Sequence, residues 1–146
     1  MLRKLIGIAA GYLFAVIFTV LALWVVYSQV NTDWAFKIES FQSSTRWVFA
    51  SIACGFIGAM IAGAVCFLIS KSSRAVNALA GVFIVVGLCL AVFALTEPGV
   101  IEYRPLQEFD FIEAREKSRS PIWYNFLMPF VSAAGVIVGG GNRKEE

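Results

Sequence analysis

Long apolar runs separated by short polar segments dominate the chain. Four stretches contain no Asp, Glu, Lys or Arg, namely residues 5–27, 47–70, 75–96 and 122–140. At a rise of about 1.5 Å per residue, each stretch is long enough to cross roughly 30 Å of hydrocarbon. The pattern therefore predicts one all-α domain over residues 1–146, an integral membrane four-helix bundle with four transmembrane helices.

A different pattern occupies the polar segment between the third and fourth spans. Pro105 can open a helix, and Leu106, Phe109 and Ile112 then recur at every third position among charged residues. This spacing predicts a short amphipathic helix in the second outer loop, lying flat on the membrane. Sealing the rim of the bundle is the favoured role of this helix, and docking of a partner is the alternative.

Composition narrows the possible functions. Hydrophobic residues make up 59% of the chain, charged residues 15%, and the mean hydropathy is +0.76, which excludes a soluble domain. The net charge of +2 argues against a nucleic acid partner, and no histidine is present to act as a general base or metal ligand. We expect no enzyme activity, no catalytic residue, no metal and no cofactor.

The basic residues near the short loops predict the orientation. They are Arg3 and Lys4 before the first span, Lys71 and Arg74 between the second and third, and Arg143 and Lys144 after the fourth. All three segments fall on one side of the membrane, and short basic segments stay in the cytoplasm. We expect a multi-pass membrane protein with both termini cytoplasmic and the lipid bilayer as its surroundings.

Small residues predict where helices pack, because close backbone approach drives helix association in lipid. In the second span, Gly55, Ala59 and Gly63 form one row at every fourth position, and Gly58, Ala62 and Cys66 form a second row. The tight turn at residues 71–74 predicts that the second and third spans are antiparallel neighbours, with Gly58 at the depth of Gly87 and Ala64 at that of Gly81. The predicted packing residues are thus Gly55, Gly58, Ala59, Gly63, Gly81 and Gly87. A homodimer through the same face is the alternative.

Polar residues inside the spans are few. Pro129 removes a backbone donor from the fourth span and frees the carbonyl of Asn125. A structural kink is the favoured interpretation, and a polar path or ligand site through Asn125, Pro129 and Ser132 is the alternative. The three cysteines, Cys54, Cys66 and Cys89, lie in apolar runs and are interpreted as small apolar fillers.

Three segments resemble a known group. They are Ala10-Gly11-Tyr12-Leu13 in the first span, Gly55-Phe56-Ile57-Gly58-Ala59 in the second, and Pro121-x-Trp123-Tyr124 with Leu127, Pro129, Gly135 and Gly139 in the fourth. With them the chain resembles small, uncharacterised four-span proteins of the bacterial inner membrane. The resemblance implies a fold and a location, and it implies no activity, cofactor or substrate. Small multidrug exporters are excluded, since they need a glutamate in the first helix and this one has none.

Two classes of function remain open. The first is a non-catalytic accessory or assembly component that contacts other membrane proteins, favoured because ionisable groups are absent from the spans. The second is a transporter or lipid-handling protein without a charged coupling residue, whose path would be lined by Ser51, Asn77, Asn125 and Ser132.

The orientation can be tested with reporter fusions. A reporter that is active only in the cytoplasm should be active when fused after Glu146 and inactive when inserted near Gln107, because the basic residues hold the termini inside. The opposite pair of activities, measured in intact cells, would overturn the assignment.

Overall fold

The computed structural model describes residues 1–30, 32–37, 42–96, 111–112 and 118–140. It contains four long helices, α1 (Leu2–Gln29), α3 (Thr45–Ser70), α4 (Ser73–Thr96) and α6 (Ile122–Gly140), and the short α2 (Thr32–Ala35). All four long helices are apolar and long enough to cross a membrane, which confirms the all-α four-helix bundle and fits a multi-pass membrane protein. The expected amphipathic helix of the second outer loop lies outside the described residues, apart from Phe111 and Ile112.

Helices α1, α3 and α4 begin before their charge-free stretches, because polar groups at the helix ends satisfy the terminal backbone groups. Ser44 is the N-cap of α3, and its hydroxyl accepts a hydrogen bond from the backbone N–H of Trp47 at 3.1 Å. At the other end of α3, Lys71 adopts the left-handed conformation with φ 54°. The Arg3 guanidinium donates to the carbonyl of Ile69 at 2.6 Å, where a cation also complements the helix dipole.

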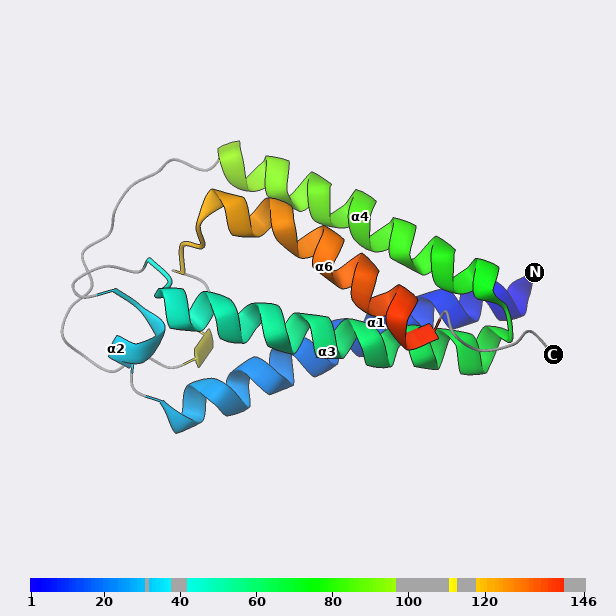
Figure 1. Ribbon diagram of the computed structural model, residues 1–146, viewed down its shortest axis with the longest axis horizontal. Coiled ribbons are helices and arrows are strands. Elements are labelled where there is room, and N and C mark those ends of the chain that lie inside the picture. Colours follow the sequence, from blue (N-terminus) through cyan, green and yellow to red (C-terminus); the bar gives the residue numbers. More distant parts are fainter. Residues whose placement is uncertain (31, 38–41, 97–110, 113–117, 141–146) are drawn as a thin grey trace.

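Helix α3 lies between α1 and α6, and α4 packs mainly against α6 (Figure 1). The start of α1, the turn between α3 and α4, and the end of α6 lie at one end of the bundle, which we call the terminal end. Short helix α2 lies at the opposite end, which we call the loop end. From the terminal end, α1 and α4 diverge toward the loop end (Figure 1). The bundle is therefore closed at the terminal end and wider between α1 and α4 at the loop end.

The two rows of small residues in α3 serve two different neighbours. On the first row, a Cβ at Gly63 would overlap the Val136 carbonyl of α6. On the second row, a Cβ at Gly58 would lie 2.9 Å from Thr19 Oγ1 of α1. Each row thus allows one neighbouring backbone to approach closely.

The expected packing of the second span against the third is wrong. Gly58 faces α1, Gly87 faces Pro129 of α6, and α3 contacts α4 only sparsely. A Cβ at Gly81 would meet no atom within 4 Å, so Gly81 is not a close-packing position. The tight turn holds the ends of α3 and α4 together, but α1 and α6 occupy both small faces of α3.

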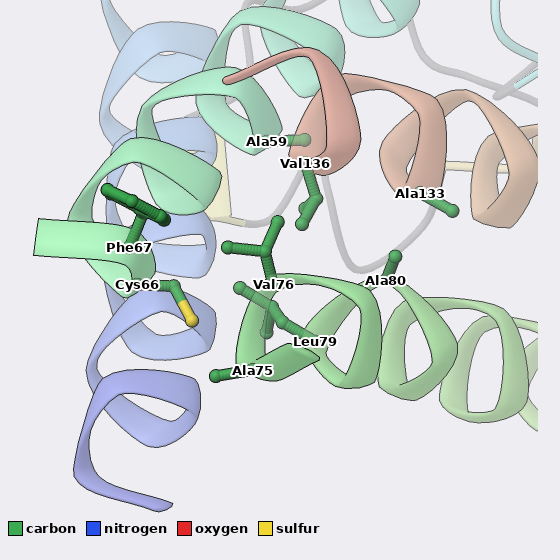
Figure 2. Packing of buried hydrophobic residues seen from close by; sticks show 9 residues of the cluster. All are labelled: Ala59, Cys66, Phe67, Ala75, Val76, Leu79, Ala80, Ala133 and Val136. Carbon is green, nitrogen blue, oxygen red and sulfur yellow. The ribbon is translucent and has the colours of Figure 1, made fainter. Parts of the chain in front are cut away.

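The main core lies toward the terminal end of the bundle. Val76 and Leu79 of α4 are fully buried between α3, which contributes Cys66, and α6, which contributes Val136 (Figure 2). Leu79 also reaches α1, since its Cδ2 atom would lie 2.9 Å from a Cβ at Gly11. All four helices are therefore joined at this end through side chains of α4.

A smaller cluster closes the loop end. Ala35 and Phe36 are buried, and Tyr27 of α1 and Trp47 of α3 pack against them. The rings of Tyr27 and Phe111 lie with centroids 5.6 Å apart, so the second outer loop also contacts this cluster. Both outer loops contribute to the loop end of the bundle.

The contact between α3 and α6 can be tested with one substitution at two positions. Gly63→Ala places a methyl group against the Val136 backbone, so α6 must move, and such overpacking costs about 1–3 kcal/mol. Gly81→Ala is the matched control, because it meets open space and raises helix propensity. Thermal unfolding followed by circular dichroism in mild detergent should show a lower midpoint only for Gly63→Ala. Equal midpoints for the two variants would contradict the packing.

Candidate ligand-binding cavities

A cavity of about 330 Å³ lies between α4 and α6, and we call it the inner cavity. It is lined by Tyr12, Phe83, Val86, Gly87, Leu90, Ala91, Ala94, Tyr124, Asn125, Met128, Pro129 and Ser132. Eight of these twelve residues are apolar. This volume is within the range of about 300–1,000 Å³ that small-molecule sites occupy.

The inner cavity reaches the surface of α4. Only Tyr12 lines it from α1, and most of its lining comes from α4 and α6. Leu90, a lining residue, is 62% exposed. Because α4 is long and apolar enough to cross a membrane, this exposed side of the cavity faces the bilayer rather than water. The cavity is thus accessible to molecules dissolved in the membrane.

The three polar-path residues of α6 come together at this cavity. Asn125, Pro129 and Ser132 all line it. The Pro129 ring packs on Gly87, where a Cβ would lie 2.8 Å from Pro129 Cβ. Helix α6 continues through Pro129 without interruption. Gly87 therefore provides space for the proline ring and also forms part of the cavity wall.

A second cavity of about 310 Å³ lies at the loop end, and we call it the outer cavity. It is lined by Thr19, Leu23, Tyr27, Phe36, Trp47, Ser51, Phe111, Ser118, Ser120 and Tyr124. Seven of these ten side chains have a hydroxyl or an indole N–H. The outer cavity is thus much richer in hydrogen-bonding groups than the inner one.

Hydrogen bonds between the two outer loops build the wall of the outer cavity. The hydroxyls of Ser43 and Ser118 lie 3.1 Å apart, and the Ser43 N–H donates to the Arg119 carbonyl at 3.0 Å. Ser44 donates through its N–H to the Ala35 carbonyl at 2.8 Å. These contacts fix residues 118–120 beside the start of α3.

Tyr124 lines both cavities, so this one side chain borders the inner and the outer cavity. Among the residues that the structure describes, no charged side chain lines either cavity. Ser51 and Ser132 are 5% and 8% exposed, and within the described part of the chain neither hydroxyl has a hydrogen-bond partner. A buried polar group without a partner is costly, so each favours a ligand that supplies one.

Other candidate residues lie elsewhere. Asn77 is exposed on α4 near the terminal end and lines neither cavity. Cys66 is buried in the main core, Cys54 is half-buried and Cys89 is exposed, and all three are free. Across the described ranges, no group of three or more Cys, Asp or Glu residues could hold a metal ion.

Several lining residues could not be assigned to a site from the sequence. Tyr12 and Phe83 have ring centroids 5.2 Å apart across α1 and α4, where they close the terminal end of the inner cavity. In the sequence, Tyr124 has the position of an ordinary aromatic residue at the membrane interface. The signal that could have assigned it to a site is its position beside Asn125 and near Pro129.

No family model, curated protein or solved structure matches the chain.

Proposed function

We propose that this protein is a non-catalytic membrane protein that binds an apolar molecule taken directly from the bilayer. The observation that supports this function is the inner cavity, which is mostly apolar and reaches the exposed surface of α4 at Leu90. Of the two classes that the sequence left open, lipid handling is thus better supported than an accessory role.

The chemistry of the spans supports a binding role over a coupled pump. An ionisable residue in the membrane is the usual mark of a proton or ion pathway, and residues 5–27, 47–70, 75–96 and 122–140 contain none. The cavity instead offers Asn125 and Ser132 as isolated polar groups in an apolar wall. Such an arrangement orients an uncharged ligand by one or two hydrogen bonds.

An accessory or assembly role is the second candidate. Helices α1 and α4 bury only a small share of their apolar residues inside the bundle. Faces that contact lipid can also contact helices of a partner, including a second copy of this chain. We propose the bacterial inner membrane as the location, as the resemblance implies, with the terminal end in the cytoplasm, as the basic residues predict. Membership of the four-span group stays a prediction.

The proposed function is tested by analysis of the lipid that co-purifies with the protein. Val86 lines the inner cavity, whereas the adjacent Val85 does not and is 62% exposed. Val86→Trp should fill the cavity, and Val85→Trp adds the same side chain on the lipid-facing side. After purification in mild detergent and extraction, mass spectrometry should find one ligand per chain in the wild type and in Val85→Trp. Most of that ligand should be missing from Val86→Trp.

Equal lipid content in the two variants would mean that the retained lipid surrounds the bundle, and it would contradict the proposal. A wild-type protein that retains no small molecule but brings down a stoichiometric partner protein would favour the accessory role instead.

A further inference from the structure

We propose that the inner and outer cavities form one site for an amphiphile with a single hydrocarbon chain and an uncharged head group that bears hydroxyls. The chain occupies the inner cavity, and the head group occupies the outer cavity. This inference rests on the proposed function and adds the chemical class and the orientation of the ligand.

The contrast between the two linings supports this orientation. Four of twelve residues that line the inner cavity are polar, against seven of ten in the outer cavity. Both linings include Tyr124, so the polar and the apolar space adjoin. A molecule that occupies both therefore needs one polar and one apolar end.

The depth of the residues matches the position of a lipid in the bilayer. Tyr124 lies near the start of α6, and Ser132 lies eight residues further along, which is roughly 12 Å along the helix axis. Tyr27 and Trp47, at the ends of α1 and α3 that face the outer loops, have the amphipathic rings that favour the membrane interface. A ligand in this orientation keeps its head group at the interface and its chain in the hydrocarbon.

Ser51 identifies the chemistry of the head group. Ser51 is 5% exposed and lines the outer cavity, and its hydroxyl has no hydrogen-bond partner in the described part of the chain. Because Ser51 is almost completely buried, a ligand hydroxyl that bonds Ser51 removes the cost of the unpaired group. The hydroxyls of Thr19, Ser118 and Ser120 also line this cavity and can take part in the same network.

The charge of the lining determines the charge of the head group. No Asp, Glu, Lys or Arg among the described residues lines the outer cavity. Burial of a carboxylate or phosphate without a cationic partner costs far more than burial of a hydroxyl that is hydrogen-bonded. A neutral head group is therefore preferred over an anionic one.

Three probes with the same oleoyl chain test this inference, namely 1-monooleoylglycerol, methyl oleate and oleate. Competition on the detergent-solubilised full chain is measured by native mass spectrometry. The wild type should bind monooleoylglycerol about fivefold more tightly than methyl oleate. This difference is what about one additional hydrogen bond, from a glycerol hydroxyl to Ser51, contributes. It should bind oleate more weakly than monooleoylglycerol. Ser51→Ala should remove the preference over methyl oleate, and Ser51→Thr, which keeps a hydroxyl, should retain it.

Two control variants separate the possible failures. Ser28 is exposed and its hydroxyl bonds the Val25 carbonyl, so Ser28→Ala should change no affinity. Val86→Trp should weaken binding of all three probes. If that loss occurs but Ser51→Ala leaves the preference unchanged, the head-group site is wrong and the proposed function stands. Tighter binding of oleate than of monooleoylglycerol would overturn the neutral head group, and no binding of any probe would overturn both proposals.

Discussion

Close backbone contact of α3 with two neighbours is the constraint on which the rest of the bundle depends. Lipid tails are as apolar as the side chains of the helices, so burial of apolar surface gives little drive for association. Dispersion between closely packed backbones must supply the attraction, and it weakens steeply with small gaps. Gly63 on one face of α3 and Gly58 on the other allow this approach, to α6 and to α1 respectively. Helix α3 is therefore the central element.

The position of α4 follows from this constraint. With both small faces of α3 occupied, α4 packs on α6 instead, and the start of α4 is held by the turn at residues 71–72 and by the core around Leu79. At the loop end of the described helices, α4 has no close packing contact with α1 like the contact that it makes with α6. The inner cavity lies along α4 and α6 in this wider part of the bundle, and the outer cavity lies at the loop end. The cavities thus arise because α1 and α4 do not pack against each other through small residues as α3 does with α1 and α6.

The number of helices and their limits could be predicted from the sequence, because absence of charge over a membrane thickness is a local property. Helix α6 begins and ends where the charge-free stretch does, whereas α1 begins three residues earlier, at Leu2, since Arg3 finds a partner at the end of α3. Which helices pack against each other could not be predicted. Every span contains small residues, and a small residue does not show which helix will pack on it. Likewise Asn125, Pro129 and Ser132 stood out as polar or irregular positions, but the outer cavity depends on contacts between loops distant in sequence.

Disulfide formation between α1 and α3 tests the account of α3 most directly. In a background where Cys54 and Cys89 are alanine, Gly11→Cys places its Cβ 3.2 Å from that of the native Cys66, near the usual range of about 3.5–4.5 Å. Oxidation in membranes should therefore link the two within one chain. A pair at similar depth, Ala64→Cys with Gly81→Cys in a background without native cysteines, should stay reduced, since Gly81 has no neighbour within 4 Å. A disulfide in the second pair and none in the first would contradict the account and place α4, rather than α1, against α3.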